Sequence, residues 1–166
     1  MGYQIDEALL KSLNLQPAAD QADSYQIVIP VRCNIARNTV ERYARETPDS
    51  LALVFEDENL ELQTWTFAEL DRDASKLAYH LTGLGIKRGD RVALHTGMRP
   101  ETGIAHMALH KLGVVAVTLS QLYGPDTLAH ILNHAEAIAI ISQDTAWDRF
   151  RSRISEFGTL AHRIVV

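Results

Sequence analysis

The sequence contains a single cysteine, Cys33, among its 166 residues. One thiol forms neither an intrachain disulfide nor a CxxC pair, which is typical of proteins in a reducing compartment. Clusters of Lys and Arg are also missing, and the 16 basic residues are outnumbered by 21 acidic ones. This balance argues against a nucleic-acid partner, because binding to a phosphate backbone requires a basic surface.

Segments that would direct the chain to a membrane are missing as well. The first residues lack the cationic start and the apolar stretch of a signal peptide. Asp6 stands where the myristoylation pattern needs Ser or Thr. No apolar run approaches the ~20 residues of a membrane-spanning helix. We therefore expect a soluble cytoplasmic protein without a membrane partner.

Motifs for phosphate binding and for nucleophilic catalysis are absent or wrongly placed. The sequence has no GxxxxGK(S/T) loop and no G-x-S-x-G elbow. The glycine-rich run 83–89 follows a helical pattern and precedes a strand, whereas a dinucleotide-binding loop follows a strand and opens a helix. We interpret this run as a helix end and a tight turn, and Cys33 as a small apolar thiol.

Histidines form two pairs with i, i+4 spacing, His106 with His110 and His130 with His134. If both pairs faced each other, their nitrogens could hold a metal ion in tetrahedral geometry. However, Met107 stands where a zinc-protease helix has its general-base Glu. Consecutive helices of a parallel sheet often lie on opposite faces, so we predict surface or hydrogen-bonded histidines and no metal site.

The first part of the chain, residues 1–32, is expected to be a peripheral lead-in or linker. Within it we predict a short helix at 6–15, a polar linker at 17–24 and an extended run at 25–31. The remaining residues, 33–166, are expected to form one domain.

That domain opens with a helix at 34–47, which Pro48 ends. Two strands, 51–56 and 61–66, are separated by polar residues and predict a hairpin. Thr66 and Glu69 have the spacing of a capping box, so a helix begins there, and Gly85 ends it.

From Asp90 onward, apolar runs alternate with helical patterns. We predict strands at 91–95, 114–119, 137–141 and 163–166, with helices at 100–112, 125–133 and 145–157. Strands that are apolar on both faces are typical of parallel sheets covered on two sides. The predicted fold class is therefore α/β, a mainly parallel sheet with helices on both faces, preceded by a helix and a β-hairpin.

The last predicted strand ends the chain, so we expect the 166 residues to be a truncated part of a larger domain. Such a sheet would retain apolar surface without a partner, on the outward sides of 114–119 and 137–141 and at an open strand edge. Self-association through this uncovered sheet is the expected consequence.

Ligands of open parallel sheets bind beyond the carboxyl ends of the strands. The predicted ends are 95–99, 120–124 and 142–144. The middle one combines a hydroxyl, a carboxamide, an aromatic ring and a bend-forming glycine. We therefore predict that it forms the ligand wall, through Ser120, Gln121, Tyr123 and Gly124.

In their order and spacing, these segments resemble the N-terminal region of the adenylate-forming, or AMP-binding, enzymes, in particular the acetyl- and medium-chain acyl-CoA synthetases. The resemblance covers residues 34–166. It is carried by TWTFAEL at 64–70, GIKRGDRVA at 85–93, MRPE at 98–101, LGVVAV at 112–117 and GPDTL at 124–128.

The resemblance implies an ATP-dependent acyl-CoA synthetase. In that reaction a small carboxylic acid and Mg-ATP give an acyl-adenylate, and coenzyme A then displaces AMP. The family's phosphate loop, ribose-binding Asp and catalytic Lys have no counterpart here, so no catalytic residue is assigned and no cofactor is expected for this part alone. Residues 120–124 would lie near the CoA path, although Gln121 and Leu122 stand where acetyl-CoA synthetases have Gly-Gly.

Two alternatives remain open at this point. One is a self-contained flavodoxin-like α/β module that binds a ligand or a protein without catalysis. The other is an interaction or regulatory domain derived from a synthetase. A reading frame that continued well beyond Val166 would favour the synthetase.

Overall fold

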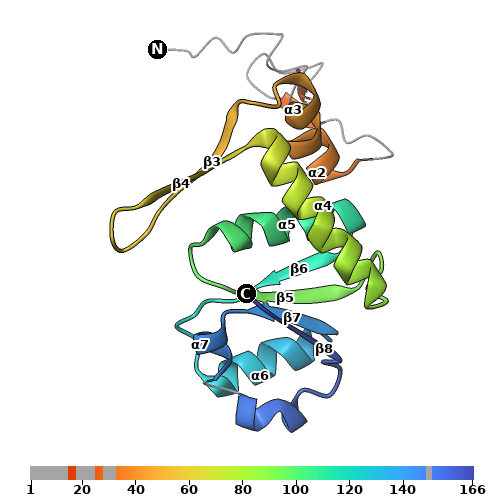
Figure 1. The fold of residues 1–166 in the computed structure, drawn as a ribbon. Coiled ribbons are helices and arrows are strands. Elements are labelled where there is room, and N and C mark those ends of the chain that lie inside the picture. The colour runs from red at the N-terminus through yellow and green to blue at the C-terminus, as the bar shows by residue number, and fades with distance from the viewer. Residues whose placement is uncertain (1–14, 18–24, 28–32, 149–150) are drawn as a thin grey trace. The chain divides into compact units, whose positions relative to one another are not determined.

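The computed structural model describes residues 15–17, 25–27, 33–148 and 151–166 (Figure 1). The chain divides into two units, Met1–Cys33 and Asn34–Val166. In the first unit, β1 (Leu15–Pro17) pairs with β2 (Tyr25–Ile27) in an antiparallel ladder. The helix expected at 6–15 and the linker expected at 17–24 lie almost wholly outside the described residues.

The second unit begins with two short helices, α2 (Ile35–Asn38) and α3 (Val40–Glu46). One continuous helix over 34–47 was expected, and this prediction is wrong. At Thr39 the backbone leaves the helical region, with φ −113° and ψ −96°. The hydroxyl of this β-branched residue donates to the Ile35 carbonyl at 2.7 Å, and such local bonds compete with the helical pattern.

Cys33 precedes these helices and is exposed. We interpreted Cys33 as a small apolar thiol, and its exposure shows that the side chain is not buried.

The predicted hairpin is confirmed. Strand β3 (Leu51–Glu56) pairs antiparallel with β4 (Leu62–Thr66). The Asp57 carboxylate holds the turn, since it accepts from the amides of Asn59 at 2.8 Å and Glu61 at 2.9 Å.

Helix α4 (Phe67–Gly83) follows β4 directly, and its capping box is present as predicted. The Glu69 carboxylate accepts from the Thr66 amide at 2.9 Å, and the Thr66 hydroxyl accepts from the Glu69 amide at 3.3 Å. The chain leaves the helix through Gly85, whose φ of 82° lies in the left-handed region that glycine adopts without strain. None of the helices in the described ranges could span a lipid bilayer.

Four parallel strands form the main sheet, as predicted. They are β5 (Arg91–His95), β6 (Val115–Thr118), β7 (Ala139–Ser142) and β8 (His162–Val165). Their order across the sheet is β6-β5-β7-β8, and each neighbouring pair is parallel.

Helices cover both faces of this sheet. Helix α5 (Pro100–Leu112) lies on one face with α4 beyond it, and α6 (Pro125–His134) lies on the other (Figure 1). Strand residues alternate between the two layers: Val92 and Leu94 pack with α4 and α5, whereas Ala93 packs with α6. This double covering explains why the strands are apolar on both faces.

The helix predicted over 145–157 is replaced by two shorter pieces, α7 (Asp144–Trp147) and the 3₁₀ helix η1 (Arg151–Glu156). Tertiary contacts hold the ends of this segment. Trp147 and Phe157 are both buried in the α6 layer. The Asn133 carboxamide, on α6, donates to the Glu156 carbonyl at 2.9 Å and accepts from the Gly158 amide at 3.1 Å.

The expected apolar outward side of 137–141 is also corrected. Every residue of β7 is buried, because α5 and α6 cover the two faces of this inner strand. Exposed apolar side chains lie instead on the outer strands, where Val115 of β6 is 50% exposed and Val165 of β8 is 40% exposed.

Candidate functional site

The strand order creates a topological switch point between β5 and β7. After β5 the chain continues into α5 on one face of the sheet. After β7 it continues into α7, on the face covered by α6 (Figure 1). Diverging connections leave a crevice beyond the carboxyl ends of the two strands, and ligands of open α/β sheets bind in such crevices. The candidate site is therefore at this edge.

Two carboxamides and one backbone amide meet at the switch point. Gln143 follows β7 and Gly97 follows β5. The side-chain oxygen Oε1 of Gln143 accepts a hydrogen bond from the Gly97 backbone amide at 3.1 Å. The same oxygen accepts from the side-chain amide of Gln121, which follows β6. A Cβ added at Gly97 would lie 3.1 Å from Gln121 Oε1, so the Gln121 carboxamide would have to shift by a few tenths of an ångström to make room for it.

Hydroxyl groups and one imidazole support the β5–α5 loop from behind. The Thr102 hydroxyl donates to the Gly97 carbonyl at 2.6 Å and lies 2.8 Å from the hydroxyl of buried Thr96. His106 Nδ1 lies 2.9 Å from the Thr102 carbonyl, which can only accept, so Nδ1 carries the proton. His106 Nε2 lies 3.1 Å from the Thr118 hydroxyl, and this contact links α5 to β6.

A groove of about 580 Å³ opens above this cluster. One wall is the β5–α5 loop with Gln121 and Gln143, and the other is the turn end of the β3–β4 hairpin. A second hollow of about 420 Å³ adjoins it and is more apolar, with Leu53, Val54 and Pro100 in its lining. The two share Phe55 and Met98, so they form one continuous depression.

Negative charge dominates the groove. Glu56, Asp57 and Glu58 line it, and among its described lining residues Arg99 carries the only positive charge. Arg99 is itself paired with Glu101, with contacts of 3.2 and 3.4 Å. The amide of Glu61, and then that of Asn59, lower the pKa of the Asp57 carboxyl, which stays ionised at neutral pH.

The four predicted wall residues lie at and after the end of β6. Only Gln121 lines the groove. Ser120 forms the tight turn after β6, since its carbonyl accepts from the Tyr123 amide at 3.2 Å. Tyr123 is 42% exposed, and Gly124 is the N-cap of α6. Strand order, which the sequence pattern does not reveal, brings Gly97 and Gln143 together in the lining of the groove.

The histidine pairs do not converge, because α5 and α6 lie on opposite faces of the sheet (Figure 1). Ring centroids within each pair are 6.1 Å apart for His106 and His110 and 5.9 Å apart for His130 and His134. Burial, with a smaller contribution from His106, lowers the pKa of His110. In the described part of the chain, no group of three or more His, Cys, Asp or Glu is placed to hold a metal ion.

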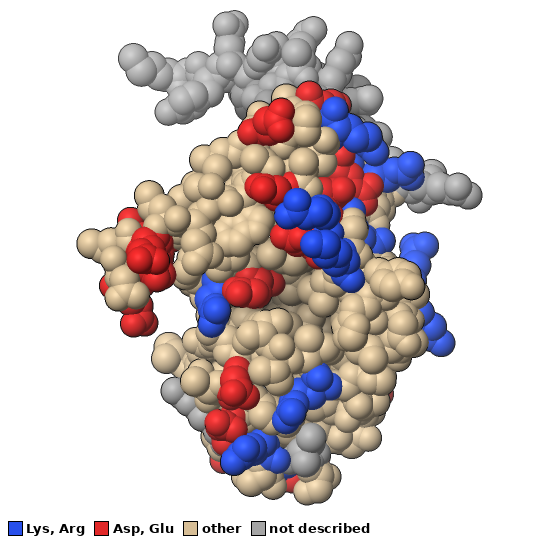
Figure 2. Space-filling view, viewed as in Figure 1, with Lys and Arg blue, Asp and Glu red and all other residues tan. Residues whose placement is uncertain are grey.

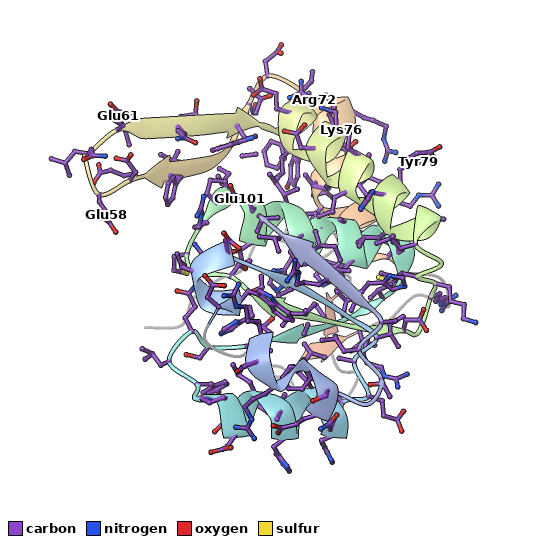
Figure 3. The ribbon with its side chains drawn as sticks, turned by 60° about the horizontal axis from the view of Figure 1, so that its bottom comes forward. Glu58, Glu61, Arg72, Lys76, Tyr79 and Glu101 are labelled. Carbon is purple, nitrogen blue, oxygen red and sulfur yellow. The ribbon has the colours of Figure 1, made fainter. Side chains whose placement is uncertain are left out.

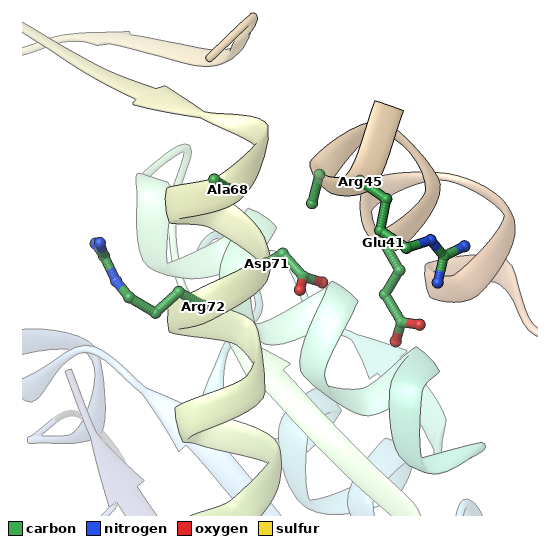
Figure 4. A pocket seen from close by; sticks show the side chains of 6 residues that line it. Glu41, Arg45, Ala68, Asp71 and Arg72 are labelled. Carbon is green, nitrogen blue, oxygen red and sulfur yellow. The ribbon is translucent and has the colours of Figure 1, made fainter. Parts of the chain in front are cut away.

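A further hollow of about 370 Å³ lies between α3 and α4, and Figure 4 shows the charged side chains around it. Its two carboxylates, Glu41 and Asp71, are engaged by the ammonium of Lys111, at 2.7 and 2.8 Å. Because these charges already hold three helices together, we assign this hollow a structural role.

Comparison with known proteins defines the class. Residues 40–164 match the family model described as AMP-binding enzyme, so the chain belongs to this family and fits its N-terminal region. It is 35% identical over 117 residues to an acetyl-coenzyme A synthetase of Deinococcus radiodurans, and 34% identical over 117 residues to one of Streptomyces coelicolor. Each alignment covers 70% of this chain and 18% of the relative, so the chain spans less than a fifth of these proteins.

Solved structures agree with this assignment. An anthranilate CoA ligase in complex with anthranoyl-AMP superposes with a TM-score of 0.75 at 25% identity, over 83% of this chain and 26% of that one. A fatty acyl CoA synthetase of Mycobacterium tuberculosis gives a TM-score of 0.71 at 27% identity, over 80% of this chain and 26% of its own. The α/β fold with a parallel sheet and an antiparallel hairpin is thus that of this family's N-terminal region.

Proposed function

We propose that this chain is the N-terminal part of an ATP-dependent acyl-CoA synthetase that joins a small carboxylic acid to coenzyme A. The observation that carries the proposal is the family match over residues 40–164, together with the likeness to acetyl-coenzyme A synthetases. In the proposed reaction the carboxylate attacks the α-phosphate of Mg-ATP, and pyrophosphate leaves. The CoA thiol then attacks the acyl-adenylate, and AMP leaves as the thioester forms.

Residues of the described groove do not fit the triphosphate of ATP. Phosphate transfer needs cations or amide donors around the developing charge. Glu56, Asp57 and Glu58 instead give the groove a negative wall, and Arg99 is paired with Glu101. We therefore assign no catalytic residue to this chain and propose that ATP and Mg²⁺ are bound by the rest of the parent enzyme.

The isolated chain is accordingly expected to release no pyrophosphate above background when it is incubated with acetate, Mg-ATP and coenzyme A. A coupled pyrophosphate assay makes the measurement, with a full-length acetyl-CoA synthetase as the positive control. Calorimetry of the same sample should show no binding of Mg-ATP in the micromolar range. Micromolar affinity would contradict the assignment, because it would require a phosphate site among these residues.

For coenzyme A we propose a partial site at the wall formed by Ser120, Gln121, Tyr123 and Gly124. Its support is chemical. The Gln121 carboxamide can pair with the amide groups of the CoA arm, and the exposed Tyr123 ring can stack on an adenine. The α6 N-terminus has no side-chain cap, and in this proposal the amides that follow Pro125 meet an anionic group of the ligand, with Asp126 as a like charge beside them. In this proposal the rest of the parent enzyme completes the coenzyme A site.

The cytoplasmic location expected from the sequence stays a prediction.

Titration with millimolar coenzyme A is expected to shift the backbone amide signals of 120–124 in a nitrogen–proton correlation spectrum. Binding should be weak and in fast exchange, because only part of the site is present. The Tyr123→Ala variant should lose most of the shifts. A matched control is Tyr79→Ala, which removes an exposed tyrosine on α4 and should leave them unchanged. Shifts confined to other segments would show that this wall does not bind coenzyme A.

A further inference from the structure

Two histidines of α6 take no part in the proposed function. His130 and His134 are both exposed, and their rings lie face to face, with centroids 5.9 Å apart and planes inclined by 10°. In the described part of the chain, neither ring is held by a hydrogen bond or an ion pair. Side chains on the outer face of α6 point away from the sheet (Figure 3), so these imidazoles are accessible to a ligand from solution.

The other five histidines are arranged differently, and all seven lie in the described ranges. His95 is buried, and both ring nitrogens of His106 make contacts within the fold. The Nδ1 atom of His110, which completes the pair on α5, is also buried. His80 and His162 have no histidine four residues away. Among the described histidines, two exposed imidazoles therefore lie one helical turn apart only on α6.

A spacing of four residues allows two imidazoles of a helix to bind one metal ion. Residues i and i+4 are neighbours on the helix surface, with Cβ atoms about 5–6 Å apart, and zinc-protease helices use this spacing. A ring nitrogen binds zinc at about 2.0–2.1 Å, so the two rings must turn until one nitrogen of each points to a common centre. Because both side chains are exposed, the described fold leaves room for this rotation.

The position of the pair on α6 favours a cation. His134 is the last residue of the helix, and His130 lies one turn before it. The last carbonyls of a helix carry partial negative charge, which stabilises a cation near the last turn. On the face seen in Figure 2, acidic and basic side chains alternate over the part formed by α6 and η1, so positive charge does not gather there.

We propose that His130 and His134 bind one divalent transition-metal ion, Ni²⁺, Cu²⁺ or Zn²⁺, through one nitrogen of each ring, with water as the remaining ligands. Imidazole suits these metals, whereas carboxylate and water suit Mg²⁺ and Ca²⁺. The site is therefore distinct from that of the Mg²⁺ of the proposed reaction. The sequence led us to expect no metal site, because the two histidine pairs were not expected to meet, but a site with two protein ligands needs only one pair.

Other groups that could bind a metal ion lie away from α6. Glu56, Asp57, Glu58 and Glu61 form a red cluster at the turn end of the hairpin (Figure 2), and Figure 3 shows Glu58 and Glu61 at the opposite end of the molecule from α6. Excess Ca²⁺ competes for such oxygen ligands and leaves the imidazoles free. Cys33 is an exposed thiol and the only cysteine, so Cys33→Ser removes that alternative.

Calorimetric titration of Ni²⁺ into this chain, with excess Ca²⁺ in the buffer, tests the proposal. We expect one bound ion per chain. His130→Gln and His134→Gln should each weaken binding about tenfold or more, because each leaves a single imidazole. The matched control is His80→Gln, which removes an exposed histidine that stands alone on α4 and should change nothing. Glutamine is a good helix former, and the three positions are exposed, so all variants should fold.

The location of the ion and the stability of the fold give two further readouts. Ni²⁺ is paramagnetic and should broaden the backbone amide signals of 130–134 before any others. A ligand of the folded state raises Tm, here by a few degrees in excess Ni²⁺, and either α6 variant should abolish the rise.

Four results would overturn the proposal. They are an absence of Ni²⁺ binding, unchanged affinity in His130→Gln or His134→Gln, an equal loss in His80→Gln, and loss of binding in Cys33→Ser. Broadening that begins at the hairpin would likewise place the ion on the carboxylates and not on α6.

Discussion

Replacement of Leu94 by alanine is expected to lower the free energy of unfolding by about 3 kcal/mol, within the roughly 2–5 kcal/mol typical of buried leucines. Leu94 is fully buried in β5, and its side chain packs in the layer formed with α4 and α5. The truncated side chain would leave a cavity. The flanking strands are held by their hydrogen-bond ladders and the helices by their own packing, so they cannot move in to fill it.

Urea unfolding followed by circular dichroism gives the measurement, and Leu122→Ala is the matched control. Leu122 is 94% exposed, so its truncation should change stability by less than about 0.5 kcal/mol. Since β5 carries the loop with Gly97, the Leu94 variant should also weaken the amide cluster at the switch point. Equal effects of the two substitutions would contradict the assignment of β5 as the centre of the core.

Replacement of Lys111 by methionine is expected to cost about 2 kcal/mol of stability. Its side chain is only 12% exposed, and its ammonium joins Glu41 of α3 and Asp71 of α4 to α5. Without the cation, two half-buried carboxylates face each other unpaired, and unpaired buried charge costs more than the pair gains. Lys76→Met is the matched control: Lys76 pairs with Asp73 but is 69% exposed, so its loss should cost less than about 0.5 kcal/mol.

Alkaline pH gives a second readout for the same group. Burial would lower the pKa of the Lys111 ammonium, but hydrogen bonds to Asp71 and Glu41 outweigh burial and raise the pKa above its ordinary value of 10.5. A raised folded-state pKa means that the contribution is complete below pH 10.5 and disappears as the pH rises through the folded value. The wild-type chain should lose this stability in alkali, whereas Lys111→Met should show no such loss from this group. If the stability of the wild-type chain and that of Lys111→Met changed with pH in the same way, the assigned role of Lys111 would be contradicted.

Local signals predicted those elements whose ends are fixed by their own residues. Helix α5 begins and ends where Pro100 and Gly113 indicated, because proline suits the first turn and Gly113, with φ of 68°, suits the left-handed position after the last turn. The capping box of α4 is equally local, since Thr66 and Glu69 satisfy each other's amides. Such elements could be assigned before any tertiary contact was known.

Two helices were predicted wrongly, and distant contacts explain one of them. The segment after Gln143 was expected to be one helix, yet burial of Trp147 and Phe157 and the bonds made by Asn133 divide it. Periodicity cannot show such a division, since the partner residues lie on α6. The break at Thr39 has a local cause, but a single threonine is tolerated in many helices and so gave no clear signal.

The sequence by itself determined the fold class, because apolar runs separated by helical patterns can bury both faces only in a parallel sheet with helices on either side. It also predicted that the candidate ligand site lies beyond the carboxyl ends of the strands. Only the tertiary structure decided which strand ends meet. The order β6-β5-β7-β8 places β7 beside β5, so that Gly97 and Gln143, 46 residues apart in the chain, share a hydrogen bond at the centre of the groove. Neighbours in a parallel sheet are set by how the crossover helices pack, and that packing depends on the whole chain at once.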